Sequence, residues 1–327
     1  MKHIYRPVRF YATVFAFTWS CWFAAILLKD GAVCTVALLL GLLAPSITAV
    51  VTVFSSGDSQ LKEDFKQKIT GLYRLNPRVI AEAIAVFSAI VFVSILASTL
   101  FGQSLDQLSF AEGFTFKGPG LASALLTILL ASVVEEVGWR GYGEDAIAQY
   151  NCWFKESILF GCIWALWHLP LFWIPGTYHY GLWDLGLVFV LNFFVSVIPF
   201  GFLTTWVYVK SKRSMLACII FHLFVNFAQE KIALTPETKC IETLVVTVAA
   251  VVIVFMNREM FFETRHIGNL PDNFPRANFF PQSVMRSRSM GPNPLKLCEE
   301  LLAYGNIPTG SVVLDHLNTI AVRLRRR

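Results

Sequence analysis

Eight segments of this chain are almost entirely apolar, and most of them have the length that a helix needs to cross a lipid bilayer. They are residues 10–28, 33–54, 79–101, 120–141, 156–174, 183–209, 215–229 and 240–256. About 20 helical residues span the hydrocarbon core of a bilayer. Only 15% of the residues are charged, against about 25% in soluble domains. We therefore predict an all-α fold, a polytopic transmembrane helical bundle of about eight spans.

The Lys and Arg residues between these segments predict how the chain is oriented. If the N-terminus is cytoplasmic, the inside segments hold 22 basic residues and the outside segments hold 4. Basic residues are enriched in cytoplasmic loops. We therefore expect a multi-pass protein of the cell membrane with its N-terminus and C-terminus in the cytoplasm.

The composition changes after residue 256. Residues 257–327 are rich in Pro and Arg and end in three arginines, so we expect a cytoplasmic, largely disordered basic tail after a transmembrane helical domain of residues 1–256. The seven cysteines are scattered and form no CxxC pair. This spacing favours neither a disulfide framework nor a thiolate metal site.

Three of the predicted spans carry polar side chains that are costly in hydrocarbon and usually mark function. The segment 120–141 includes Glu135, Glu136 and Arg140 near its end. Glu136 and Arg140 are four residues apart, so they share a helix face and can pair. Glu135 points about 100° away from Glu136 on a helix and lacks that partner. Its carboxylate is therefore a candidate for proton transfer with water.

The other polar residues are His168 in the segment 156–174 and the pair His222 and Asn226, one turn apart, in the segment 215–229. With about 1.5 Å of rise per residue, all four side chains, including that of Glu135, lie roughly 10 to 18 Å below the predicted cytoplasmic ends of their spans. Their common depth predicts one shared site. Each residue alone also allows a structural role, because a single intramembrane His can hydrogen-bond between helices.

This pattern resembles the CAAX protease and bacteriocin-processing family of intramembrane endopeptidases (the CPBP or Abi family), which includes the type II CAAX prenyl endopeptidases. The motifs are Glu-Glu-x-x-x-Arg, aromatic-x-x-x-His and His-x-x-x-Asn, in this order and on separate spans. In this chain they consist of Glu135, Glu136, Arg140, Trp164, His168, His222 and Asn226. The resemblance covers about residues 80–256, the expected protease core. Trp164 stands where the family often has Phe, a difference that we expect to be tolerated.

The resemblance implies an intramembrane endopeptidase that hydrolyses a peptide bond in a membrane-associated or lipidated protein or peptide. Glu135 and His168 would activate the attacking water, and His222 and Asn226 would stabilise the oxyanion. Glu136 and Arg140 would support the site. We expect no cofactor, although two His and one Glu can also hold Zn²⁺ with an open fourth position.

Two other functions stay open from the sequence. The first is a non-enzymatic immunity or scaffold protein of the same fold. The second is a transporter, because carboxylates and histidines also form proton relays in membranes, although this chain shows no internal repeat of the kind many transporters have. We expect the partners to be the lipid bilayer and a peptide or protein substrate in or at the membrane, and no nucleic acid.

Overall fold

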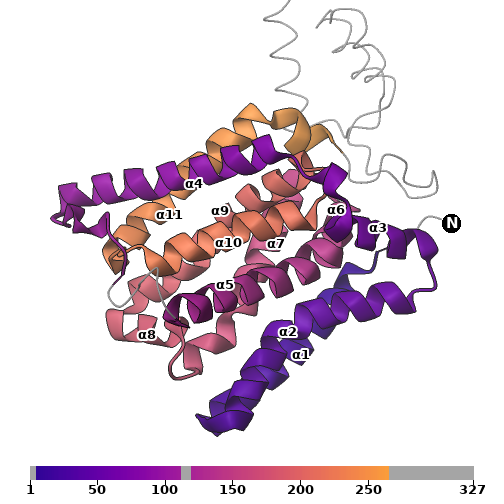
Figure 1. Ribbon diagram of the computed structural model, residues 1–327, viewed down its shortest axis with the longest axis horizontal. Helices are drawn as coiled ribbons and strands as arrows, with labels where there is room; N and C mark the ends of the chain where they lie inside the picture. The colour runs from indigo at the N-terminus through magenta and orange to yellow at the C-terminus, as the bar shows by residue number, and fades with distance from the viewer. Residues whose placement is uncertain (1–4, 112–118, 265–327) are drawn as a thin grey trace, which may run out of the picture. The chain divides into compact units, whose positions relative to one another are not determined.

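Long apolar helices form most of the computed structural model (Figure 1). The structure describes residues 5–111 and 119–264, and it describes only the backbone of residues 119–125 and 127. Each of the eight predicted spans overlaps one long helix. These helices are α1 (Pro7–Leu28), α2 (Gly31–Ser55), α4 (Pro77–Ser98), α5 (Pro119–Gly138), α7 (Trp153–Trp167), α9 (Leu187–Lys210), α10 (Met215–Lys231) and α11 (Pro236–Met256).

Short helical elements connect the long ones. They are α3 (Ser59–Thr70), α6 (Glu144–Ala148), α8 (Tyr178–Leu185), the 3-10 turns η1 (Leu72–Arg74), η2 (Thr99–Phe101), η3 (Leu105–Gln107) and η5 (Leu169–Trp173), and the π turns η4 (Trp139–Gly143) and η6 (Glu259–Glu263). Within the described residues, extended pairing is limited to one isolated bridge between Phe110 and Ile232. The predicted all-α fold is confirmed.

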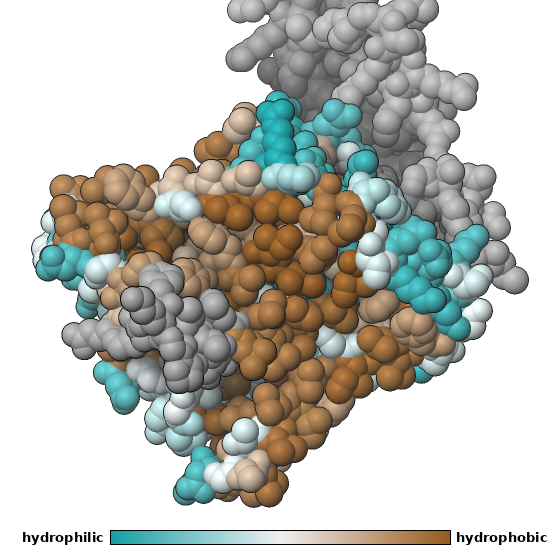
Figure 2. Space-filling model, viewed as in Figure 1, coloured by the Kyte–Doolittle hydropathy of each residue, from teal (hydrophilic) through white to brown (hydrophobic). Residues whose placement is uncertain are grey.

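Within residues 5–111 and 119–264, six helices are long and apolar enough to cross a membrane: α1, α2, α4 with η2, α7 with η5, α9 and α11. The other two predicted spans are α5 and α10, so the count of eight is approximate. Many large apolar side chains are exposed on the helices, including Leu27, Val248 and Phe255. Hydrophobic residues cover much of the face shown in Figure 2, and hydrophilic residues gather at its edges. These features identify a multi-pass membrane protein.

Small residues allow the helices to approach closely where the bundle carries the polar side chains. A Cβ atom on Gly138, at the end of α5, would lie 2.7 Å from the backbone carbonyl carbon of Pro45 in α2. A Cβ atom on Gly161, in α7, would lie 2.9 Å from the Cα atom of Ile198 in α9. Close approach of this kind is a common way to pack helices in a membrane. It fixes α5 and α7 against their neighbours.

One end of the bundle contains α3, η4, α6 and residues 211–214, and we call it the α3 end. A buried ion cluster joins these elements: Lys68 pairs with Asp145, and Arg213 pairs with Asp145 and with Asp64, at 2.6 Å from the latter. The opposite end contains η3, α8 and residues 232–235, and we call it the α8 end. The cluster anchors α3 to the bundle.

The chain remains ordered beyond the predicted domain boundary at residue 256. The π turn η6 buries Met260 and Phe261, and Phe261 packs on Phe202 of α9 with ring centroids 5.9 Å apart. This turn belongs to the segment predicted as a tail. Residues 265–327 of that predicted tail lie outside the described residues.

Candidate active site

A cavity of about 700 Å³ lies among α5, α7, α8, α9, α10 and α11. Its lining includes Glu135, His168, His222 and Asn226, the four residues that the sequence predicts to share a site. The lining continues to Lys231 and Lys239 toward the α8 end. Ligand-binding cavities in proteins have volumes of about 300 to 1,000 Å³. The cavity therefore has room for a segment of peptide.

Glu135 lies in the last turn of α5, and its carboxylate faces α7. Its Oε2 atom accepts a hydrogen bond of 2.8 Å from the indole Nε1 of Trp164. The residue is 7% exposed, so the carboxylate is nearly enclosed but still lines the cavity. The sequence leaves Glu135 without a partner, and the structure supplies one from another helix.

His168 caps the C-terminus of α7, where η5 begins. Its Nδ1 atom lies 2.7 Å from the backbone carbonyl oxygen of Trp164. A carbonyl oxygen can only accept a hydrogen bond, so Nδ1 carries the proton and Nε2 keeps its lone pair. Since Nε2 is the basic atom, His168 can take a proton from water at that position.

His222 lies at the end of a chain of buried charges. Its Nδ1 atom donates to Glu136 Oε1 at 2.8 Å, and Arg140 Nη1 donates to the same oxygen at 3.1 Å. The Nε atom of Arg140 lies 2.8 Å from Glu144 Oε2. The guanidinium also lies over the ring of Phe160, with its carbon 4.5 Å from the centroid. The spacing of Glu136 and Arg140 correctly predicts their pair, and the equal spacing to Glu144 could have predicted the second pair.

Asn226 lies one turn after His222 on α10 and is half-buried. Its Nδ2 atom donates to the hydroxyl of Ser132 at 3.3 Å, and that hydroxyl donates to the backbone oxygen of Ile128 at 2.9 Å. This arrangement ties the amide of α10 to the wall of α5. One N–H of the amide is held by Ser132, which leaves the second available toward the cavity.

The structure adds His179, to which the sequence assigns no role. It lies on α8, lines the cavity, and stacks on His168 with ring centroids 5.4 Å apart. Burial lowers the pKa of His179 well below its ordinary value, and His168 lowers it further. The ring is therefore neutral at pH 7. No periodicity marks this residue, because its position depends on how α8 folds back against α9.

The grouping of possible metal ligands can be stated for the described residues. In the part of the chain that the structure describes, no group of three His, Cys, Asp or Glu residues could hold a metal ion. Six cysteines belong to these residues, and all of them are free thiols.

The chain is similar to a known protein family and to a known protein. A family model described as type II CAAX prenyl endopeptidase Rce1-like matches residues 117–228. CAAX prenyl protease 2 of Methanococcus maripaludis is 35% identical over 263 residues, which are 79% of this chain and 97% of the relative. The matched segment of the family model contains all six predicted site residues, namely Glu135, Glu136, Arg140, His168, His222 and Asn226.

Proposed function

Because this chain belongs to the Rce1-like family of type II CAAX prenyl endopeptidases, we propose that it hydrolyses a peptide bond close to a lipidated cysteine of a membrane-attached protein. The observation that supports this most is the convergence of Glu135, His168, His222 and Asn226 on one cavity. These side chains come from three helices that are separate in the sequence. A scaffold protein needs no such convergence.

In the proposed reaction, a water molecule lies between the Glu135 carboxylate and Nε2 of His168. The water oxygen attacks the carbonyl carbon of the scissile bond while its proton passes to the carboxylate–imidazole pair. Because His168 donates its Nδ1 proton to a backbone carbonyl, its Nε2 lone pair remains free for this step. The proton then passes to the leaving nitrogen when the C–N bond breaks.

The negative oxygen of the intermediate would be stabilised by Asn226 and His222. The amide supplies an N–H directly. His222 donates its Nδ1 proton to Glu136, so an N–H at Nε2 requires the doubly protonated ring. The carboxylate of Glu136 favours that ring. Glu136 and Arg140 would then act by fixing the charge and the orientation of His222.

The substrate and the orientation follow from the membrane setting. A lipidated peptide is already anchored in the bilayer, so its scissile bond can reach a site between apolar helices. We propose that both termini face the cytoplasm of the cell, because the α3 end of the bundle carries most of the basic residues outside the tail. The cavity extends toward the α8 end, so this orientation decides from which side the peptide arrives.

The test is cleavage of a peptide with a prenylated cysteine near its C-terminus by the purified protein in proteoliposomes. Wild type is expected to release the C-terminal fragment, and Glu135→Gln and His168→Ala are expected to lose at least a thousandfold in kcat. Glu63→Gln, which changes an exposed carboxylate on α3, is the matched control and is expected to retain activity. Full activity of both site variants would contradict the proposed chemistry.

The same cleavage assay tests whether the reaction requires a metal ion. Since the proposed reaction uses the chain's own carboxylate and imidazoles, dialysis against EDTA or 1,10-phenanthroline is expected to leave kcat unchanged. A loss that added Zn²⁺ restores would favour the zinc mechanism instead.

A further inference from the structure

Trp164 contacts three of the four proposed catalytic residues, and it does so with different parts of the residue. Its indole Nε1 donates to Glu135 at 2.8 Å. Its backbone oxygen accepts from Nδ1 of His168 at 2.7 Å. The edge of its ring system meets the ring of His222, with centroids 5.6 Å apart and planes at 81°.

We propose that Trp164 is a positioning residue for the proposed hydrolysis, whose indole N–H holds the Glu135 carboxylate in the orientation that activates water. This inference rests on the proposed function. An indole nitrogen is a donor only, so it occupies Oε2 of Glu135 and leaves Oε1 for the water. Among the described residues, only Trp164 donates a hydrogen bond to the Glu135 carboxylate.

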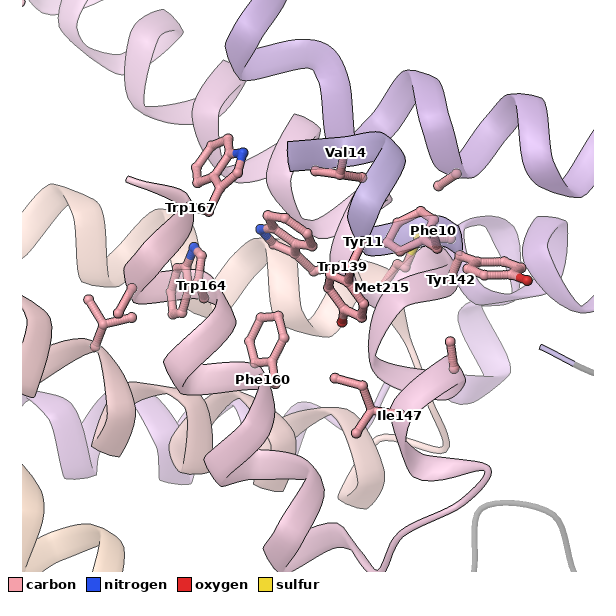
Figure 3. Packing of buried hydrophobic residues seen from close by; sticks show 14 of the residues in the cluster. Phe10, Tyr11, Val14, Trp139, Tyr142, Ile147, Phe160, Trp164, Trp167 and Met215 are labelled. Carbon is pink, nitrogen blue, oxygen red and sulfur yellow. The ribbon is translucent and has the colours of Figure 1, made fainter. Parts of the chain in front are cut away.

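The indole is itself held rigidly, as a positioning group must be. Trp164 is 8% exposed, and it stacks on Phe160 one turn earlier, with centroids 5.6 Å apart and planes at 21°. Phe160 also packs against Trp139 from the π turn that follows α5, with centroids 6.0 Å apart. Figure 3 shows Trp139, Phe160 and Trp164 in one aromatic cluster. The cluster therefore couples the position of the indole to the end of α5, the helix that carries Glu135.

The position is also where this chain differs from the family pattern, which often has Phe. A Phe ring can fill the aromatic cluster and can stand beside His222, but it has no N–H to donate. From the sequence we expect this difference to be tolerated. The hydrogen bond predicts in addition that Trp cannot be exchanged for Phe in this chain without a loss of catalysis.

The experiment compares Trp164→Phe with Trp22→Phe in the cleavage assay. Trp22 is a matched control because it is buried, donates its indole N–H to the backbone oxygen of Leu38 at 3.1 Å, and does not belong to the cavity lining. Trp164→Phe is expected to lower kcat roughly tenfold, as removal of one hydrogen bond to a charged group does, and to change KM less than twofold. Trp22→Phe is expected to keep the kcat of wild type.

A pH–rate profile separates positioning from a general structural effect. The titratable groups that interact electrostatically with Glu135 from neighbouring helices are His168 of α7 and His222 of α10. These groups remain in Trp164→Phe, and only the donated hydrogen bond is removed. The pH–rate profile is therefore expected to differ from that of wild type in Trp164→Phe and to match that of wild type in Trp22→Phe, because only the first variant lacks the hydrogen bond to Glu135.

A second replacement covers the case in which Trp164→Phe folds poorly. Benzothienylalanine at position 164 keeps the shape of the indole and replaces its N–H with sulfur, and it is expected to give the same tenfold loss in kcat. Unchanged kcat and pH profile in this protein, with Glu135→Gln inactive, would overturn the role of Trp164 and leave the proposed function intact. Activity in Glu135→Gln would overturn both.

Discussion

The carboxylate of Glu136 binds the imidazole of His222 and the guanidinium of Arg140 through the same oxygen. It accepts from His222 at 2.8 Å and from Arg140 at 3.1 Å, and all three side chains are buried. A buried charge that loses its partner is costly, at about 3 to 5 kcal/mol. We therefore expect Glu136 to contribute to stability and, in the proposed reaction, to catalysis through the same contacts.

Glu136→Gln is expected to reduce both the stability of the protein and its catalytic rate. The amide cannot balance the doubly protonated ring of His222, and it leaves Arg140 with Glu144 as its carboxylate partner. We expect kcat to fall at least a hundredfold and the melting temperature in detergent to drop by several degrees, with Glu63→Gln unchanged in both. A variant with normal stability and normal kcat would show that the charge of Glu136 has neither role.

Asn226 offers the most direct test of the oxyanion site. Loss of one oxyanion donor typically lowers kcat by about 10² to 10³, so Asn226→Ala is expected to fall in that range with little change in KM. Asn192→Ala is the matched control, because Asn192 also lines the cavity and donates to the backbone oxygen of Lys239. Equal effects of the two substitutions would point to cavity shape and not to oxyanion stabilisation.

The contacts of these residues can be predicted from the sequence to different extents, for physical reasons. Helical spacing identifies contacts within one helix, such as Glu136 with Arg140, because the geometry of a single helix is known in advance. The bond from Trp164 to Glu135 joins two helices, and no spacing within one helix predicts which faces meet. The position of His179 depends on how the short helix α8 folds against α9, which apolar periodicity does not describe.

At the scale of the helices, the position of the site depends on how closely α7 approaches α9. Gly161 faces the backbone of Ile198, and a Cβ atom on Gly201 would lie 3.2 Å from the Cα atom of Gly161. These glycines let the two backbones touch. His168 and Trp164 follow on the next turns of α7, so a shift of this helix would move both.

Gly161→Ala is therefore expected to push α7 away from α9. We expect a lower melting temperature, by several degrees, and a kcat at least tenfold below wild type, measured on the same detergent-solubilised samples. Gly181→Ala on α8 is the control, because nothing lies within 4 Å of the added Cβ atom. If Gly161→Ala matched this control, the close contact would have no role in positioning the site.

The ion cluster of the α3 end predicts a pH dependence of stability. Burial raises the pKa of Asp64, but the positive charges of Lys68 and Arg213 outweigh burial and hold it below its ordinary value. A lowered folded pKa stabilises the protein fully above the unfolded pKa, about 3.9, and this contribution is lost as pH falls through the folded pKa. The melting temperature of wild type is thus expected to fall more steeply below pH 4 than that of Asp64→Asn. Parallel curves would contradict the assignment.

The apolar periods of the sequence predict the existence of the long helices well and their boundaries less well. The predicted segment 183–209 begins inside α8 and crosses a break at Gly186, where φ is +118° and favours glycine. The segment 156–174 continues past the end of α7 at Trp167, because residues Leu169–Trp173 form a 3-10 turn that is equally apolar. Hydropathy detects burial in lipid and not backbone geometry, so such breaks are missed.

At the scale of the whole molecule, the side of the membrane that each end faces is open to direct measurement. Lys66→Cys on α3 and Asp106→Cys on η3 place exposed thiols at opposite ends of the bundle. In a background without the seven native cysteines, an impermeant maleimide on intact cells is expected to label Asp106→Cys and to spare Lys66→Cys. Labelling of Lys66→Cys alone would reverse the proposed orientation, and with it the side to which the cavity extends.

The proposed role of Glu135, activation of the water that cleaves a membrane-attached protein, can be tested without knowing that protein. Membranes of cells that carry wild type or Glu135→Gln at equal abundance are compared by mass spectrometry of protein C-termini. At least one membrane-associated protein is expected to have a C-terminus that is shortened with wild type and uncut with the variant. Identical termini in the two membranes, with a wild type that is active on a prenylated peptide, would contradict it.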